Sequence, residues 1–490
     1  MFWFVFSLVL AVAILGCAFL AKKKGDAALD RIIKISATAF ITLSVAGLFL
    51  PDLFMCSHEA ETLAAMTGTK FHAIIRWLNL VCFTVLPIAV FQQNKYFEKM
   101  ASYFCLPMAL VNVGFFEQYM EYFTANSNSG LQTVRLFSQE FKDFLIDPEF
   151  RSVFFGLTCL CQILTLFLLT CRNREKLAVS KSETGKLLLI LAGVTYMSLP
   201  IFVPQYLFGH VDIMMIGFTL PHYIWIAITI LVIHVLYRMF QYKCYESKYM
   251  LVLSMAWALM MQFSQMFTAS SELNLMKLPL QLCNLGSYLA LLMLVKKSDK
   301  IFHFTLIVNV VGAAIAFLVM DIGKDSSHLT RLWVVHYIVE HTKVLAIPVL
   351  CLVLRIFKPI EARSIKHFSI GFTTYYLFVF VFGTISNGFY RMFEGQHIQN
   401  FFYSNFLFMF DKEVAGRLIG FVEPLFDIWV IRMGTFEIYP VVQLLVYVVF
   451  MTVCLSLYLV VHAKTKRQRD DYANNRYLKY DQVRESESVQ

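Results

Sequence analysis

The sequence predicts an all-α polytopic membrane protein of about thirteen transmembrane helices, arranged as two degenerate tandem halves. Hydrophobic residues make up 58% of the 490 residues and charged residues only 15%, too little charge to cover a soluble surface of this size. Apolar runs of about 18 to 24 residues, the length that a bilayer requires, recur along the chain. Lys and Arg gather in alternate connections between these runs, as the positive-inside rule expects.

The predicted spans follow one another from the first residue. They are residues 2–21, 32–50, 73–92, 101–117, 152–171, 187–206, 216–237, 249–268, 278–295, 301–320, 332–354, 369–389 and 438–462. The first run, "MFWFVFSLVLAVAILGCAFLAKKK", has no basic residue before its apolar stretch. A cleaved signal peptide has such a leader, so we expect this run to be retained as a helix.

The distribution of positive charge predicts an orientation. If residues 22–24 ("KKK") are cytoplasmic and the sides alternate, the cytoplasmic segments hold 29 of the 42 Lys and Arg residues. The N-terminus is therefore expected outside and the C-terminus in the cytoplasm, in a multi-pass protein of the cell membrane. The net charge of +9 fits contact with an anionic leaflet and gives no reason to expect nucleic acid as a partner.

Similar short patterns divide the chain into two halves and a tail. "LNL" at 78–80 aligns with "CNL" at 283–285, and each is followed by a long apolar run, a basic loop and "VNV". We infer a tandem duplication, a common feature of membrane proteins. The predicted domains are a degenerate six-helix half (1–215), a seven-helix half (216–462) and a disordered cytoplasmic tail (463–490). Because Leu78 stands where the second half has Cys283, any chemistry is expected in the second half.

Helical spacing sorts the residues of span 278–295 into two faces. The face of Cys283 is otherwise small: Gly286, Ser287 and Ala290. The second face is polar: Gln281, Asn284 and Tyr288. One interpretation gives Gln281 and Asn284 hydrogen bonds between helices and makes Cys283 a packing residue. The other makes Cys283 a reactive thiol that these amides support, because polar groups inside a bilayer often mark a functional site.

The next span, 301–320, carries Asn309 on a stripe of small residues. Gly312 and Ala316 have the small-xxx-small spacing that lets helices approach closely, so tight packing is expected here. Asp321 ends this span at the predicted outer boundary. It is either a solvated charge or a partner of Arg331.

Span 332–354 contains four ionisable side chains within eight residues. His336, Glu340 and Lys343 share one face by helical spacing, and His341 lies on another with Tyr337. Such a stripe is either a self-neutralising structural feature or part of a functional site.

Cys283 and His341 are expected at similar depth. Counted from the outer ends of their spans at 1.5 Å per residue, both lie roughly 9–14 Å inside the membrane. A thiol beside an imidazole is a nucleophile and its base, suited to accepting an acyl group from a lipid ester as a thioester. By chemistry alone, Gln281, Asn284 and Asn309 are candidate donors to the tetrahedral oxyanion.

Other chemistries have little support. The chain has no P-loop, no GxGxxG after a strand, no HExxH and no CxxC pair with zinc spacing, so no cofactor and no metal are predicted. Most of the eleven cysteines fall within predicted spans, which indicates packing residues rather than a disulfide framework. The stretch 390–437 includes the aromatic "IQNFFYSNFLFMF", which is too short to span and is expected at the interface or as a re-entrant segment.

Six motifs occur in order through residues 216–462. They are "FTLPHY" (218–223), "LPLQLCNL" (278–285), "VVGAAIAFLVMD" (310–321), "HTKVLAIP" (341–348), "ISNGFYRM" (385–392) and "FEIYPV" (436–441). With them the second half resembles the YwaF-like integral membrane proteins, whose usual unit is a single seven-helix module. The chain departs from that pattern by its additional first half and by a proline-rich entry to the last helix that is reduced to "IYP".

The resemblance implies an activity and a site. Eukaryotic relatives of the family include a transmembrane acyltransferase that moves acyl chains between phospholipids, with a paired Cys and His implicated in catalysis. Cys283 matches the family cysteine, and His341, seven residues before a proline, matches the histidine, with His336 as the competing assignment. Membrane phospholipids or other acyl lipids are then the expected partners.

Three functions follow as hypotheses. The first is lipid acyl transfer through a thioester on Cys283. The alternative is a lipid or small-molecule transporter or scramblase without covalent catalysis, which the duplicated architecture and the stripe of His336, Glu340 and Lys343 favour. The third is a membrane scaffold whose tail (463–490) recruits partners.

Overall fold

The computed structural model describes most of the chain. The described residues are 2–49, 69–117, 120, 138–201, 203–209, 211–269, 275–318, 328–362, 364–396, 398–413, 415 and 422–474. They form two compact units, each taken here by itself. The N-terminal unit comprises residues 1–210 and 264–271, and the C-terminal unit comprises residues 211–263 and 272–490.

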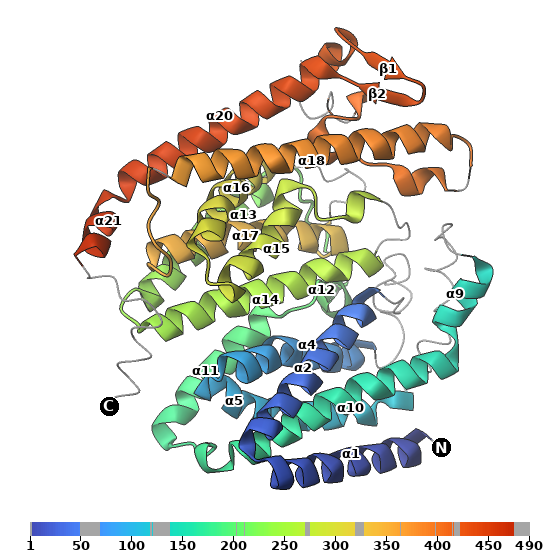
Figure 1. The fold of residues 1–490 in the computed structure, drawn as a ribbon, viewed down its shortest axis with the longest axis vertical. Coiled ribbons are helices and arrows are strands. Elements are labelled where there is room, and N and C mark those ends of the chain that lie inside the picture. Colours follow the sequence, from blue (N-terminus) through green and yellow to red (C-terminus); the bar gives the residue numbers. More distant parts are fainter. Residues whose placement is uncertain are drawn as a thin grey trace. The chain divides into compact units, whose positions relative to one another are not determined.

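Helices make up nearly all of the secondary structure in the described residues (Figure 1). The N-terminal unit contains α1 (Phe2–Lys24), α2 (Asp26–Phe49), α4 (Thr69–Pro87), η2 (Ile88–Gln92), α5 (Lys95–Met100), η3 (Ala101–Cys105), α6 (Leu106–Gly114), α9 (Gln139–Ile146), α10 (Pro148–Arg172), η4 (Arg174–Lys176), α11 (Lys181–Met197) and α12 (Val203–Phe208). The helices that follow are α13 (Leu220–Phe240), α14 (Tyr245–Ala269), η5 (Leu275–Lys277), α15 (Leu282–Val295), α16 (Asp299–Leu318), α17 (Leu332–Val353), α18 (Ser364–Met392), η7 (Gln399–Phe402), η8 (Phe406–Phe408), η9 (Glu423–Asp427), α20 (Pro440–Lys464) and α21 (Lys466–Ala473). The two strands, β1 (Ile431–Met433) and β2 (Phe436–Ile438), pair antiparallel.

The predicted fold class is confirmed: the protein is an all-α polytopic membrane protein. Among the described residues, seven helices are long and apolar enough to cross a bilayer: α1, α10, α13, α16, α17, α18 and α20. Every other predicted span also contains helical residues. Helix α13 shows the expected lipid-facing surface, because Ile224, Ile228 and Leu231 are exposed although apolar.

In the N-terminal unit, α10 packs along α2. Buried hydroxyls of Ser36 and Thr165 hydrogen-bond between them at 2.7 Å. At one end Arg172 forms ion pairs with Asp30 on α2 (2.6 Å) and Glu98 on α5 (3.1 Å). These contacts join three helices through one guanidinium group, which suits such pairing because its donors point in several directions.

One predicted span of this unit is broken. The sequence predicts a continuous helix over 187–206, but α11 ends at Met197 and α12 begins at Val203. Pro200 explains the break, because a proline disfavours the helical conformation of the residue before it. Ser198, at the C-cap of α11, donates its backbone N–H to the Val194 carbonyl and closes the last turn.

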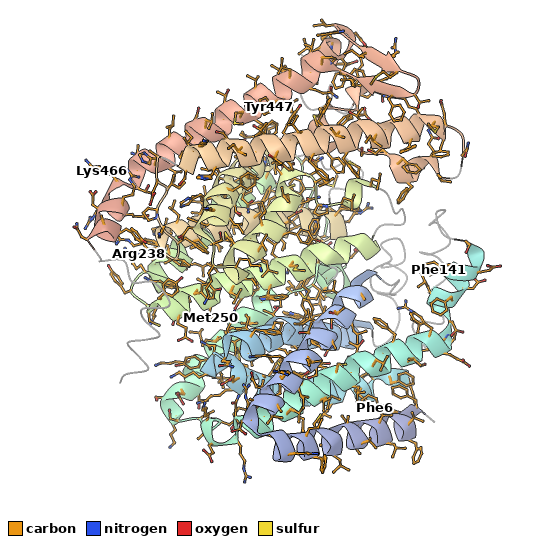
Figure 2. The ribbon with its side chains drawn as sticks, in the orientation of Figure 1. Phe6, Phe141, Arg238, Met250, Tyr447 and Lys466 are labelled. Atoms are coloured by element: carbon orange, nitrogen blue, oxygen red, sulfur yellow. The ribbon has the colours of Figure 1, made fainter. Side chains whose placement is uncertain are left out.

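In the C-terminal unit, α15, α16 and α17 pack against one another and form the core. Helix α18 contacts α16, and α20 contacts both α16 and α18 (Figure 1). Tyr447, labelled on α20 in Figure 2, joins α20 to α18 through a 2.8 Å hydrogen bond between its hydroxyl and that of Thr373. The strand hairpin lies at one end of this pair, where β2 packs on α18.

The start of α15 differs from the prediction. The sequence predicts a helix from residue 278, but α15 begins at Leu282, with Gln281 as its N-cap. Pro279 explains the late start, since it restrains the preceding residue to extended conformations. Cys283 therefore lies in the first turn of its helix and not about one and a half turns inside it.

Two further segments are described at the C-terminal end of the unit. The aromatic stretch that was expected at the interface or as a re-entrant segment folds into η7 and η8, and Phe406, Leu407 and Met409 are buried. The first part of the predicted disordered tail is helical, because α21 spans Lys466–Ala473. Residues 475–490 lie outside the described residues.

Candidate functional site

Cys283 occupies a helix N-terminus, where backbone N–H groups have no partners within the helix. The dipoles of the backbone N–H groups of Cys283 and Asn284 interact favourably with negative charge on the Cys283 sulfur. The thiol itself donates to the Asn284 side-chain oxygen, with 3.3 Å between Sγ and Oδ1. The helix dipole, positive at this end, favours negative charge on the sulfur, whereas burial and the charge of Glu340 oppose it.

A buried carboxylate on α17 interacts electrostatically with this thiol. Glu340, on α17, is 3% exposed and close enough to Cys283 for an electrostatic interaction. The Ser287 hydroxyl, one turn after Cys283, donates to Glu340 Oε1 at 3.4 Å. On its other oxygen Glu340 pairs with His336 Nε2 at 3.0 Å. Serine, glutamate and histidine thus form a buried polar chain behind the cysteine.

His341 follows Glu340 in sequence and is 4% exposed. Its Nδ1 lies 2.7 Å from the Tyr337 carbonyl, and its ring packs on the Tyr337 ring at 4.2 Å between centroids. A carbonyl only accepts, so Nδ1 carries the proton and Nε2 keeps its lone pair in the neutral imidazole. Glu340 interacts electrostatically with both His341 and Cys283. Among the hydrogen bonds of the described residues, none joins Cys283 directly to His341.

Asn309 holds three helices together. Its side-chain N–H₂ group donates to the carbonyls of Gly286 on α15 and Val344 on α17, both at 3.2 Å. Glycine at 286 is required, since a Cβ there would lie 2.3 Å from the Asn309 oxygen. Both amide hydrogens are therefore engaged in helix packing, and the donor role to an oxyanion that chemistry suggested for Asn309 has no free hydrogen.

The close approach of α16 to α15 continues at Gly312. A Cβ on Gly312 would lie 3.3 Å from Leu282 Cβ and 3.4 Å from the Cys283 nitrogen. Tight packing was predicted here from the spacing of Gly312 and Ala316. The backbone of Cys283 is thus fixed from the α16 side.

Gln281 forms hydrogen bonds to another element, as one of the two interpretations expected. Its amide nitrogen donates to the Asn405 carbonyl at 3.1 Å, and its oxygen accepts from the Leu407 N–H at 3.0 Å. Gln281 thereby fastens the start of α15 to the buried 404–410 segment. Tyr375 of α18 secures the same turn by donating to the Leu280 carbonyl at 2.6 Å.

The predicted stripe on α17 divides between two neighbours. His336 and Glu340 pair with each other, but Lys343 donates to the Gln262 side chain on α14. Lys343 thus contacts α14, whereas Glu340 contacts α15 through Ser287. Asp321 and its possible pairing with Arg331 lie outside the described residues.

Several residues of the site were missed or underrated by sequence reasoning. Helical spacing places Ser287 on the same face of its helix as Cys283. Its hydrogen bond to Glu340 also depends on how α17 is rotated about its own axis, which helical spacing does not predict. Tyr375 is aromatic within an aromatic helix, so no signal distinguished it. Outside this site, His222 of the "FTLPHY" motif is 1% exposed and accepts the Phe218 N–H at Nδ1, 3.0 Å away.

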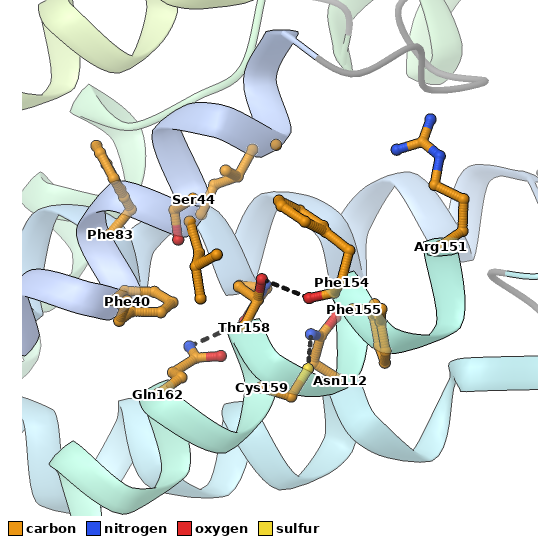
Figure 3. Close-up of a pocket in the computed structure, with 14 residues that line it drawn as sticks. Phe40, Ser44, Phe83, Asn112, Arg151, Phe154, Phe155, Thr158, Cys159 and Gln162 are labelled. Atoms are coloured by element: carbon orange, nitrogen blue, oxygen red, sulfur yellow. Dashed lines mark hydrogen bonds between the residues drawn. The ribbon is translucent and has the colours of Figure 1, made fainter. Parts of the chain in front are cut away.

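The N-terminal unit has a polar pocket of about 90 Å³ of its own (Figure 3). Gln162 there donates to Asn79 at 3.2 Å, and Asn112 donates to the Cys159 sulfur at 3.5 Å. Arg151, which is 2% exposed, also lines it. In the described part of the chain, neither unit has three His, Cys, Asp or Glu side chains placed to hold a metal ion.

Comparison with known proteins gives one match. Residues 217–459, which include Cys283, Glu340 and His341, match the model of the TMEM164 family. No curated protein and no solved structure matches the chain significantly. The C-terminal half of this integral membrane protein therefore matches the TMEM164 family.

Proposed function

We propose that this protein transfers an acyl chain from one membrane lipid to another through a thioester on Cys283. The observation that carries the proposal is the position of this thiol in the first turn of α15, where the helix dipole is positive, with Glu340 interacting electrostatically with both Cys283 and His341. The resemblance of the second half to YwaF-like proteins, with Cys283 and His341 at the family positions, supports the same assignment.

The first half-reaction begins at the thiol. His341 Nε2 accepts the Cys283 proton, and Sγ attacks the carbonyl carbon of a lipid ester. When the tetrahedral intermediate collapses, the carbon–oxygen bond to the donor breaks. The imidazolium returns its proton to the leaving oxygen, which releases a lysolipid and leaves an acyl thioester. We propose N–H groups of the first turn of α15 as the donors to the oxyanion.

The second half-reaction reverses the roles. The hydroxyl of an acceptor lysolipid attacks the thioester carbon and gives its proton to His341. The carbon–sulfur bond breaks, the acyl chain leaves on the acceptor, and the thiolate regains its proton. In both steps Glu340 balances the charge of the imidazolium, while His336 and Ser287 hold Glu340 in position.

The experiment follows an isotope-labelled acyl chain from phosphatidylcholine to a lysophospholipid in vesicles that contain the full-length protein. We expect Cys283→Ala to reduce transfer to the level of empty vesicles. His341→Ala is expected to slow it about 10²- to 10⁴-fold, the usual contribution of a general base. Cys351→Ala, which removes a fully buried thiol of α17, is the matched control and should transfer normally.

Two outcomes would refute the assignment. Normal transfer by correctly folded Cys283→Ala protein would exclude the thioester. Loss of transfer in His336→Ala with normal transfer in His341→Ala would assign the role of general base to His336 and not to His341.

A transporter or scramblase is the second candidate, and the polar pocket of the N-terminal unit is the observation in its favour. Asn79 and Asn112, which the proposed duplication aligns with Asn284 and Asn309, both line it. For this candidate, lipid translocation would depend on Arg151 or Gln162 and would be unaffected by Cys283→Ala. The proposed orientation is the one that the charge distribution predicts, with the C-terminus in the cytoplasm.

A further inference from the structure

The C-terminal unit contains a cavity at the end of α15 that is remote from Cys283. Its volume is about 610 Å³, within the range of roughly 300–1,000 Å³ typical of ligand pockets. It is lined by Leu289, Leu292, Asp299, Lys300, Ile301, His303, Phe304, Lys358, Glu361, Ser364, His367, Phe368 and Gly371. The lining therefore comes from α15, α16, the loop before α18, and α18 itself.

Polarity changes along this cavity in one direction. On α16, Asp299 and Lys300 line it at the helix end, and Phe304 lines it about one turn further inward. On α18, His367 stands nearer the end and Gly371 one turn further in. Charged groups thus surround the mouth and apolar groups the depth, as a molecule with a polar head and apolar chains requires.

The charged mouth carries both signs. Within the described part of the chain, neither the Lys300 ammonium nor the His367 imidazole forms an ion pair or hydrogen bond with the protein, and both residues are exposed. They are donors for a phosphate. Asp299 supplies a carboxylate on the same rim. A headgroup that joins a phosphate to an ammonium matches this pair of signs.

The frame of the mouth is held by hydrogen bonds. The Lys358 N–H donates to Asp299 Oδ1 at 3.0 Å, and His303 Nε2 donates to the Lys358 carbonyl at 2.9 Å. The loop before α18 is thereby fixed to the first turn of α16. At the inner end, Gly371 lets the Phe304 ring approach, since a Cβ there would stand 3.4 Å from that ring.

We propose that this cavity binds a zwitterionic phospholipid, with its phosphate at Lys300 and His367, its ammonium at Asp299, and its chains against Phe304 and Gly371. The basic loops at this end of the helices place the lipid in the cytoplasmic leaflet. The site is separate from the proposed acyl transfer. Leu289 is already six residues, or about 9 Å, beyond Cys283 along α15, and the headgroup is farther still.

The experiment measures lipid binding to the full-length protein by native mass spectrometry in detergent. The probes are dioleoyl phosphatidylcholine, dioleoyl phosphatidylglycerol, dioleoylglycerol and glycerophosphocholine. We expect one phosphatidylcholine to bind more tightly than the other three. Lys300→Ala is expected to weaken phosphatidylcholine binding about tenfold, because it removes a charge-assisted hydrogen bond. Gly371→Leu is expected to abolish this binding, because the leucine side chain fills the space proposed for the acyl chains.

Lys366→Ala is the matched control, because Lys366 is an exposed cation beside His367 that does not line the cavity. It should bind phosphatidylcholine as the wild type does. If Lys366→Ala weakened phosphatidylcholine binding as much as Lys300→Ala, the effect would come from surface charge in general, and the proposal would be overturned. Binding of glycerophosphocholine or phosphatidylglycerol at least as tight as phosphatidylcholine would overturn it as well, as would full binding by folded Gly371→Leu protein.

Discussion

At the scale of single residues, the site depends on how closely α15, α16 and α17 approach. Asn309 is fully buried and donates to a carbonyl on each neighbouring helix. Because Gly286 has no side chain, the side-chain oxygen of Asn309 fits against it. Because Cys283 lies three residues before Gly286, the position of the thiol depends on this contact.

Replacing Gly286 by alanine should therefore disturb both stability and the site. The added Cβ would lie 2.3 Å from Asn309 Oδ1, so the helices must separate or Asn309 must give up its hydrogen bonds. We expect a loss of about 1–3 kcal/mol, typical of overpacking a buried contact, measured as a lower unfolding temperature. Gly185→Ala on α11 is the control, since a Cβ there meets nothing within 4 Å. Equal unfolding temperatures for the two variants would contradict the contact.

The candidate site was predictable in its residue types but only partly in its contacts. Spacing within one helix put Cys283 with Ser287 and His336 with Glu340, because residues three or four apart share a face. The contact of Ser287 with Glu340 joins two helices. The residue spacing within each helix does not predict how the two helices are rotated relative to each other. For the same reason, no pattern indicated that Gln281 faces the 404–410 segment.

At the scale of elements, α18 is built to receive the segments that follow it. Gly383 and Gly388 leave room for the rings of Phe410 and Phe436, which would stand 2.3 Å and 2.0 Å from an added Cβ. Asn387 donates to the Ser404 carbonyl at 2.6 Å. The sequence predicted an interfacial or re-entrant segment here because it is short and aromatic, and composition alone did not indicate its packing against these glycines.

The strand hairpin is joined to α18 through Glu437. Its carboxylate pairs with Arg391 of α18 at 2.9 Å and with Arg432 at 3.0 Å, and it accepts from the Tyr439 hydroxyl. Partial burial raises the pKa of Glu437, but the hydrogen bonds from Tyr439 and Arg432 and the charge of Arg391 outweigh it, so the pKa lies below its ordinary value.

This direction predicts a pH-dependent contribution of Glu437 to stability. A carboxyl whose pKa is lowered by folding stabilises the fold above its unfolded pKa of about 4.3, and the contribution is lost as the pH falls through the folded value. Wild type should therefore unfold at a higher temperature than Glu437→Gln at pH 7, and the difference should vanish in acid. A difference that stays unchanged as the pH is lowered into the acid range would show that another feature of the substitution is responsible.

At the scale of the whole molecule, most of the helical segments were predictable and their interruptions were not. Bilayer-length apolar runs located them, since length and hydropathy are local properties. The breaks before Val203 and Leu282 follow from Pro200 and Pro279, which apolar run length ignores. The duplication of the two halves stays a hypothesis.

The predicted orientation is testable with one native and one introduced cysteine in the C-terminal half. Cys244 is exposed in the loop between α13 and α14, on the predicted cytoplasmic side, and Met433 is exposed on the hairpin, on the predicted outer side. In intact cells, a membrane-impermeant thiol reagent should label Met433→Cys and leave Cys244 unlabelled until the membrane is opened. Immediate labelling of Cys244 would reverse the orientation.

The central claim is that Cys283 carries an acyl chain during turnover. Its most direct test is mass spectrometry of the Cys283 peptide from protein purified with its lipids, with and without hydroxylamine. We predict an acyl adduct on Cys283 that hydroxylamine removes, that is absent in His341→Ala, and that is not found on buried Cys351. A free Cys283 thiol in the wild type, with every acyl donor lipid supplied, would contradict the thioester and with it the acyltransferase assignment.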